Sequence, residues 1–431
     1  MEKHLRAVLP LVVLLLSAPL AHTQITAIKC GRLIDGKSDT PREHVVILVE
    51  GGIIKDVVPE RSIPRGAAII DLSAATVLPG LIDCHTHVLL QGDITADDYA
   101  DQLLKESIPY RTLRASLACK TALYHGFTSI RDVETEGAMY ADVDLKKAIN
   151  NGVIEGPRMQ VATRAISTTG RYPLSNSEYA WELVLPKGVQ EITGADEARR
   201  AVREQLSHGA DWIKIYADGN YYQLPDGSFR SIPNFTEDEI NAIGDQTRML
   251  RKRLAAHAMT RDGILSAVRA GARSIEHGSA MDDECIALMV RNGVFWCPTI
   301  FVQVYVAEGR AQTGNAVFKQ MLEQLPGRFK KALKAGVKIA FGTDAGGFAW
   351  TENEAREFSY MVQWGMTPMQ AIKSATTVAA DLLDRKGSIG EIAPGAYADI
   401  IATKGNPLED ISALEHVHFV MKNGTVYKRE N

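Results

Sequence analysis

The strongest constraint on the fold is a regular alternation of short apolar runs and longer helical segments between residues 79 and 385. Several of the longer segments, such as "ADEARRAVREQLSHG" and "RDGILSAVRAG", have helical periodicity and end in glycine, as a helix C-cap does. The apolar runs end in turns or polar residues, and we interpret them as eight strands: "GLIDCHTHV", "FTSIRDV", "RMQVATRAI", "DWIKIYA", "RLAAHA", "ARSIEHG", "GVFWCPTI" and "VKIAFGTDA". Eight strands alternating with helices predict a (β/α)₈ TIM barrel. The main alternative is an open doubly wound sheet, which the lack of a GxGxxG turn after the first strand disfavours.

Both ends of the chain have a different pattern from the middle. Residues 24–78 contain short alternating segments such as "ITAIKCGRLIDG" and "HVVILVEGGIIKDVV", which predict strands. Residues 386–431 close with "HVHFVMKNGTVYK", in which Asn423 and Gly424 form a typical hairpin turn. Neither end has enough strands for a stable sheet, so we expect both to combine in one small β-sandwich domain.

The first 23 residues have the layout of a secretory signal peptide. Lys3 and Arg6 precede an apolar run, and the small residues Ala18 and Ala21 follow it. We therefore expect export to the periplasm or the medium, with no membrane attachment after cleavage; an uncleaved N-terminal anchor is the alternative. The five cysteines are too few for a disulfide scaffold in a chain of 431 residues.

Composition narrows the class of ligand. The hydrophobic fraction of 45% is ordinary for a globular protein, and the formal net charge is only −4. Such a balance gives no electrostatic footprint for nucleic acid or for an anionic membrane. We expect a small-molecule substrate.

Ionisable residues stand at the predicted carboxyl ends of several strands, where barrel enzymes carry their catalytic groups. His85 and His87 are two residues apart in a strand, so both imidazoles leave the same side, whereas Cys84 points the other way. Four more such residues end other strands: Lys214, His257, His277 and Asp344. Imidazoles and a carboxylate are suitable ligands for zinc, and also for manganese, cobalt or iron.

Lys214 does not fit a metal site as an ammonium group, because it would be repelled by a divalent cation and has no lone pair. Two interpretations are open. Lys214 is either an ordinary exposed or paired lysine, or it has reacted with carbon dioxide to give an anionic carbamate that bridges two metals. Burial favours the neutral amine that this reaction requires.

The ordered set "HTH", "WIKIY", "AAHA", "IEHG" and "GTDA" resembles the binuclear metal branch of the amidohydrolase superfamily with a carboxylated lysine. Within it, the chain is most similar to the group of imidazolonepropionase-like amidohydrolases and Xaa-Pro-type dipeptidases, over nearly the whole chain past residue 23. The resemblance implies two divalent metal ions, expected to be zinc. It assigns His85, His87 and Asp344 to the first ion, His257 and His277 to the second, and carboxylated Lys214 to both.

The resemblance also implies a reaction. A metal-activated hydroxide attacks an amide carbonyl, and Asp344 transfers the proton to the leaving nitrogen. Mononuclear deaminases of the superfamily usually carry a glutamate shortly after the strand-five histidine, whereas Ala258, Met259 and Thr260 follow His257 here. That difference favours amide hydrolysis over deamination.

Several residues are candidates for substrate binding. Tyr216 faces the same way as Lys214 in a strand, so it is a candidate to polarise the scissile carbonyl or to bind the substrate, with an ordinary barrel tyrosine as the alternative. Arg164 and Arg171 are candidates for gripping a substrate carboxylate, although a surface or structural ion pair is the alternative for Arg171. Aromatic residues in the loops expected after the fourth and eighth strands suggest an apolar pocket, with core or subunit contacts as the alternative: Tyr221, Tyr222, Phe348 and Trp350. His125 and His208 are read as helix-terminal residues on the opposite face.

The leading hypothesis is a metal-dependent amidohydrolase that cleaves the peptide-like bond of a dipeptide or an N-acyl amino acid with a free carboxylate. A lactonase or cyclic amidase with the same two metals is an alternative, and a non-catalytic binding protein on the same barrel is another. The family resemblance also leads us to expect a homo-oligomer.

Overall fold

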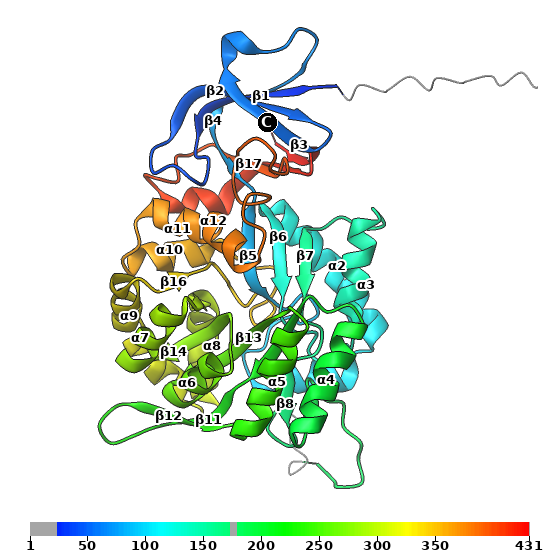
Figure 1. Cartoon of the computed structure of the whole chain (residues 1–431), viewed down its shortest axis with the longest axis vertical. Coiled ribbons are helices and arrows are strands. Elements are labelled where there is room, and N and C mark those ends of the chain that lie inside the picture. Colours follow the sequence, from blue (N-terminus) through cyan, green and yellow to red (C-terminus); the bar gives the residue numbers. More distant parts are fainter. Residues whose placement is uncertain (1–23, 173–178, 431) are drawn as a thin grey trace, which may run out of the picture.

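The computed structural model describes residues 24–172 and 179–430. The predicted signal peptide, residues 1–23, lies outside the described residues. Two parts are visible in Figure 1: a β domain and a larger barrel surrounded by helices. In the described part of the chain, no helix is both long and apolar enough to cross a membrane.

The β domain is one seven-stranded mixed sheet built from both ends of the chain, with strand order β19-β18-β17-β4-β1-β2-β3. Its strands are β1 (Thr26–Leu33), β2 (Arg42–Glu50), β3 (Ile53–Pro59), β4 (Ala68–Pro79), β17 (Ile400–Thr403), β18 (Val417–Lys422) and β19 (Thr425–Arg429). Both Asn423 and Gly424 have positive φ, 52° and 77°, as the predicted two-residue hairpin turn between β18 and β19 requires. Alternate strand residues enter two separate hydrophobic clusters, so both faces of the sheet are partly covered.

The eight predicted barrel strands are all present: β5 (Leu81–Thr86), β6 (Phe127–Asp132), β7 (Arg158–Val161), β10 (Trp212–Tyr216), β13 (Arg253–Thr260), β14 (Ser274–Ala280), β15 (Phe295–Cys297) and β16 (Lys338–Ile339). Neighbouring strands pair in parallel from β5 to β7 and from β10 to β16. The barrel closes where the Cys84 N–H donates to the Phe341 carbonyl at 2.9 Å and the Asp344 N–H donates to the His85 carbonyl at 2.8 Å. This closure brings the first and last strands together, and the first predicted site residues with the last.

Helices cover the outside of the barrel: α1 (Ala96–Lys105), α2 (Ile108–Tyr124), α3 (Ala141–Asn150), α4 (Ala195–Ser207), α5 (Glu237–Met249), α6 (Arg261–Arg269), α7 (Asp283–Asn292), α8 (Ile300–Gln312), α9 (Val317–Ala335) and α10 (Arg356–Gln363). Their ends follow local chemistry. Thr236 and Glu239 form a capping box at the start of α5, and Gly293 ends α7 in the left-handed conformation at φ 62°.

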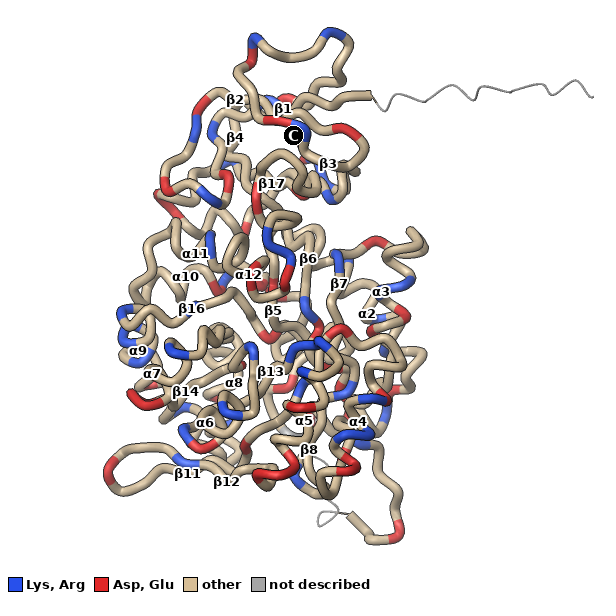
Figure 2. Tube along the Cα trace, viewed as in Figure 1, with Lys and Arg blue, Asp and Glu red and all other residues tan. Residues whose placement is uncertain are grey.

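Two segments differ from the sequence predictions. After the eighth strand, the stretch "TPMQAIKSATTVAADLLD" predicts one helix, but the structure has two short helices, α11 (Pro368–Ser374) and α12 (Thr377–Leu382), because Thr376 leaves the helical conformation with φ −129° and ψ −99°. The loop expected after the fourth strand contains a hairpin of β11 (Asp218–Gln223) and β12 (Phe229–Pro233). Charged residues of both signs are interspersed along the trace in Figure 2.

Candidate metal centre and active site

A cavity of about 430 Å³ opens at the carboxyl ends of the barrel strands. Five of the six predicted metal ligands line it: His87, Lys214, His257, His277 and Asp344. The sixth, His85, is fully buried beside His87. The barrel therefore brings together all six residues, which are up to 259 positions apart in the sequence (344 minus 85).

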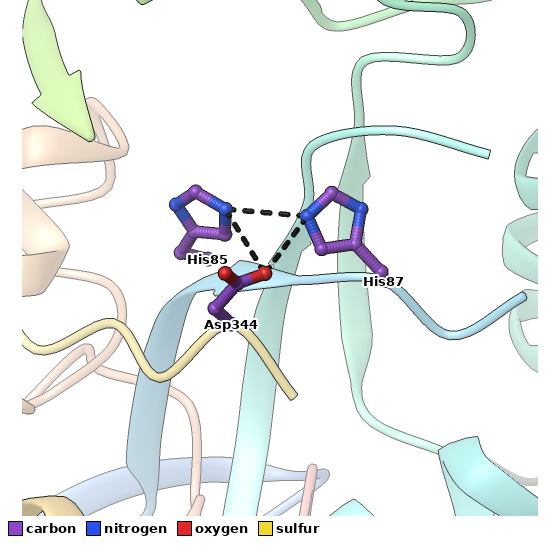
Figure 3. Close-up of side chains that lie close together, drawn as sticks. All are labelled: His85, His87 and Asp344. Carbon is purple, nitrogen blue, oxygen red and sulfur yellow. Dashed lines mark hydrogen bonds and ion pairs between the residues drawn. The ribbon is translucent and has the colours of Figure 1, made fainter. Parts of the chain in front are cut away.

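His85, His87 and Asp344 form a compact group of donor atoms, shown in Figure 3. The two Nε2 atoms are 3.3 Å apart, and Asp344 Oδ1 lies 3.1 Å from His87 Nε2 and 3.6 Å from His85 Nε2. Ligands at roughly 2.1 Å in a tetrahedron around zinc are themselves about 3.4 Å apart. The spacing of these three atoms therefore fits one metal ion.

A buried ion pair orients His85. Glu276 Oε2 lies 2.8 Å from His85 Nδ1, and Glu276 Oε1 accepts a hydrogen bond from Arg131 at 2.8 Å. The side chains of all three residues are 0% exposed. Because a carboxylate at Nδ1 holds the proton there, the Nε2 lone pair of His85 is directed at the proposed ion.

The second group consists of His257, His277 and Lys214. The two imidazole rings have centroids 4.6 Å apart. Thr299 Oγ1 lies 2.8 Å from His277 Nδ1, which leaves Nε2 as the free donor of His277. Conversely, the Tyr221 hydroxyl lies 2.6 Å from His257 Nε2, which leaves Nδ1 as the free donor of His257.

Lys214 is 1% exposed and lines the cavity. Its Nζ lies 5.1 Å from the centroid of the Tyr216 ring, and no described residue forms a hydrogen bond or a close ion pair with it. A buried ammonium without a carboxylate partner is costly.

Burial keeps most of these imidazoles neutral, which is the form that binds metals. It lowers the pKa of His85 to about 4 and that of His277 to about 3, against the opposing charge of Asp344. Burial also lowers the pKa of His257 well below its usual value. His87 is the exception: burial opposes its charged form, but the hydrogen bond to Asp344 and the charge of Asp344 raise its pKa to about 9.

Three residues at the site have left-handed backbone conformations that non-glycine residues seldom adopt: His277 at φ 69°, Thr299 at φ 47° and Asp344 at φ 63°. Strained backbone of this kind concentrates at functional sites. Two of the three are predicted metal ligands, and Thr299 holds one of these two.

A polar network that the sequence did not predict adjoins Tyr216. The Tyr216 hydroxyl donates to Glu134 Oε2 at 2.5 Å and lies 2.9 Å from the hydroxyl of Tyr172, which itself donates to Glu136. Burial and the nearby charge of Glu136 raise the pKa of Glu134 well above its usual value. Tyr216 lines the cavity, as expected, but its hydroxyl proton is already engaged in this network.

The two predicted arginines are in different places. Arg171 lines the cavity, and its guanidinium group donates to the Ile232 carbonyl at 3.5 Å. Arg164 is not part of the cavity wall: it donates to the Val189 carbonyl at 3.2 Å, because the strand ends at Val161 and the chain turns at Thr163, φ 59°. Contrary to the prediction, Arg164 is therefore not placed to contact a substrate in this cavity.

Of the four aromatic residues predicted to form the pocket, only Tyr221 lines the cavity. Tyr221 lines the cavity, whereas Tyr222 is 48% exposed and outside it, because successive residues of β11 point to opposite faces. Phe348 packs on Phe301 with ring centroids 4.7 Å apart, and Trp350 is buried with Nε1 3.3 Å from the His87 carbonyl oxygen. These two are core residues and do not line the cavity.

The histidines set aside as helix-terminal residues lie at those positions. His125 caps α2 and contacts Glu354 at 2.6 Å, and His208 caps α4 and stacks on Tyr140. Neither lines the cavity.

The far wall of the cavity is apolar and comes from α8 and α9. It is formed by Val302 and Val306 on α8 and by Val317 and Phe318 at the start of α9. Arg310 stands over the Phe318 ring, with its guanidinium carbon 4.7 Å from the centroid, and pairs with Asp93 at 3.2 Å. The cavity thus has the metal-ligand residues on one side and a hydrophobic wall on the other.

Comparisons with known proteins agree with this geometry. The model of the amidohydrolase family matches residues 76–427. Ochratoxinase from Aspergillus niger is 30% identical over 433 aligned positions, covering 94% of this chain and 87% of the relative, and imidazolonepropionase from Salinispora arenicola is 24% identical, covering 92% and 93%.

Solved structures give the same picture. A Xaa-Pro dipeptidase with methionine in its active site has a TM-score of 0.84 at 36% identity, covering 94% of this chain and all of the other. A prolidase in complex with N-methylphosphonate-L-proline has a TM-score of 0.82 at 30% identity, with the same coverage. This chain belongs to the amidohydrolase family and to its imidazolonepropionase-like group, and it is a hydrolase that acts on carbon–nitrogen bonds.

Proposed function

We propose that the protein is a two-metal amidohydrolase that cleaves the amide bond of a dipeptide or an N-acyl amino acid with a free carboxylate. The observation that carries this proposal is the convergence of two sets of donors on one cavity, with Lys214 beside them. His85, His87 and Asp344 would hold the first ion, His257 and His277 the second, and a carbamate on Lys214 both. When bound, a pair of divalent ions lowers the pKa of water and polarises a carbonyl.

Asp344 is placed to move the proton. Its Oδ1 faces the two histidines of β5 and the segment after it, while Oδ2 is 4.0 Å from His277 Nδ1. The Asp344 side chain is 17% exposed, so it retains access to the cavity. In the proposed reaction, Asp344 takes a proton from the attacking water and returns it to the leaving nitrogen.

Arg171 is the proposed partner of the substrate carboxylate. Unlike Arg310, which pairs with Asp93, it has no acidic partner among the described residues. A guanidinium group binds a carboxylate with two parallel hydrogen bonds. The wall of Val302, Val306 and Phe318 supports a substrate with an apolar side chain.

A substrate screen tests this proposal. Protein loaded with zinc in bicarbonate buffer is assayed against dipeptides, N-acyl amino acids, their C-terminally amidated forms, lactones and hydantoins. We expect hydrolysis of substrates that have an apolar side chain and a free carboxylate, and a marked loss with amidated forms. Preferential turnover of lactones or hydantoins would instead support the alternative activity, and no turnover with two ions bound would contradict the proposal.

A further inference from the structure

Tyr221 not only lines the cavity but also forms hydrogen bonds with a proposed metal ligand and with a buried aspartate. Its hydroxyl lies 2.6 Å from His257 Nε2 on one side, and 3.2 Å from the Asp218 carbonyl and 3.3 Å from Asp218 Oδ1 on the other. The three residues therefore form a chain from a carboxylate through a phenol to an imidazole. The chain ends at a proposed ligand of the second ion.

Asp218, at one end of this series of hydrogen bonds, is held rigidly. It is 1% exposed, and its two oxygens accept hydrogen bonds from the backbone N–H groups of Met259 and Thr260 at 3.1 and 3.0 Å. The hydroxyl groups of Ser231 and Thr260 each donate to Oδ2 at 3.0 Å. A methyl group at Gly263 would lie 2.5 Å from the Asp218 carboxyl carbon, so the start of α6 closes over this carboxylate.

The direction of the hydrogen bonds among Asp218, Tyr221 and His257 decides which nitrogen of His257 carries the proton. A phenol has one proton, and Tyr221 has two neighbours able to take it. If Tyr221 donates to Asp218, its oxygen accepts a proton from His257 Nε2, and the lone pair of His257 is then on Nδ1. If Tyr221 donated to His257 Nε2, a neutral His257 would carry its proton on Nδ1 and have no lone pair to offer there.

We propose that Tyr221 is a positioning residue: its hydroxyl donates to the fixed Asp218 and accepts from His257 Nε2, and so sets the His257 tautomer that binds the second ion. This inference rests on the proposed two-metal function and goes beyond it. It also changes the role predicted for Tyr221, from substrate contact to support of a metal ligand. The first ion has its own support in Glu276, so the two ions depend on different residues.

Metal titration of Tyr221→Phe tests the proposal. The substitution removes one oxygen and keeps the ring that packs against Phe318 at 5.8 Å. Metal-free protein is titrated with zinc against a chelator of known affinity, in bicarbonate buffer, to give two dissociation constants. Tyr222→Phe, on the other face of the same strand, is the matched control.

We expect Tyr221→Phe to weaken the second ion about 10–100-fold, the range seen when the outer partner of a metal ligand is removed, and to change the first less than about threefold. Excess zinc should restore most of kcat with KM close to wild type. Tyr222→Phe should leave both constants unchanged.

Two results overturn the inference and leave the proposed function standing: two wild-type dissociation constants in Tyr221→Phe, or a raised KM that excess zinc does not correct. The second would make Tyr221 a substrate contact. If wild-type protein binds only one ion, the two-metal function itself fails. ¹⁵N NMR of His257 in metal-free protein gives a readout independent of turnover: wild type should carry the proton on Nε2, and a population on Nδ1 would contradict the proposed direction of the hydrogen bonds.

Discussion

Replacing Glu276 with glutamine should damage both the stability of the barrel and its first metal position. Glu276 is fully buried, with Oε2 at 2.8 Å from His85 Nδ1 and Oε1 at 2.8 Å from Arg131, and the Ser274 hydroxyl also donates to Oε1. Burial opposes the charged form of Glu276, but Arg131 and His85 outweigh it and lower the pKa of this carboxyl. Glutamine offers one acceptor where two are needed, so its amide group must face either Arg131 or His85 as a donor.

The magnitude follows from this arrangement. An uncompensated buried charge costs about 3–5 kcal/mol. A remaining neutral hydrogen bond recovers about 1 kcal/mol, which leaves a loss of about 2–4 kcal/mol. At about 2–4 °C per kcal/mol for a large domain, Tm should fall by about 5–15 °C. If His85 changes its tautomer to suit the amide, zinc affinity at the first position should fall about 10–100-fold.

The assay is thermal unfolding of metal-free protein, followed by zinc competition with a chelator. Glu284→Gln is the control, because Glu284 is 51% exposed and pairs with Arg261 at the surface, where such pairs contribute little. The control should melt within about 2 °C of wild type. If Glu276→Gln also melts within that range and binds zinc normally, the argument from the buried pair is wrong.

Three further predictions concern other residues. Arg171→Met should raise KM about 10–100-fold for substrates with a free carboxylate and leave amidated analogues unaffected, measured by steady-state kinetics; equal losses on both would exclude carboxylate recognition. Gly346→Ala should lower Tm and the zinc content of purified protein, because a Cβ there would lie 2.2 Å from the His87 carbonyl oxygen. Gly365→Ala is the control, since Gly365 has a similar positive φ (119° against 110°) and a Cβ there would have no contact under 3.5 Å. Equal effects of the two substitutions would mean that backbone strain, and not the contact with His87, causes the loss. Burial opposes the charged form of His125, but its hydrogen bond to Glu354 raises its pKa, so its stabilisation is present at low pH and lost as pH rises through the folded pKa. The Tm difference between wild type and His125→Gln should therefore be larger at pH 6 than at pH 9, and a constant difference would contradict this sign.

The sequence predicted the parts of the fold that depend on local pattern. Each barrel strand is a short apolar run, and the candidate ligands are polar residues at the carboxyl ends of those runs, so Lys214 and His277 were recognisable without coordinates. The Asn423-Gly424 hairpin was equally local. In contrast, Glu276 contacts His85 and Arg131, which are 191 and 145 positions away in the sequence, and no local pattern predicts such contacts. The only local indication was that Glu276 is a charged residue in an apolar strand, which predicts a buried partner but not which residue it is.

The errors have local physical causes as well. Arg164 was placed at a strand end, but β7 stops at Val161 and the turn at Thr163 carries the side chain away from the cavity. The pattern of residues 217–235 predicts a loop where the structure has the hairpin of β11 and β12, although Asp226 and Gly227 lie between its strands and are typical of a turn. That hairpin carries Tyr221 to His257, so the role of Tyr221 became visible only in three dimensions.

The proposed function requires that one cavity holds two ions, with a carbamate on Lys214 between them. A crystal structure of the protein grown with zinc and bicarbonate, with anomalous scattering at the zinc edge, tests it most directly. We expect two anomalous peaks, one bound by His85, His87 and Asp344 and one by His257 and His277, with density for a carboxylate on Lys214 reaching both. A single peak, or an unmodified Lys214 beside two ions, would contradict it.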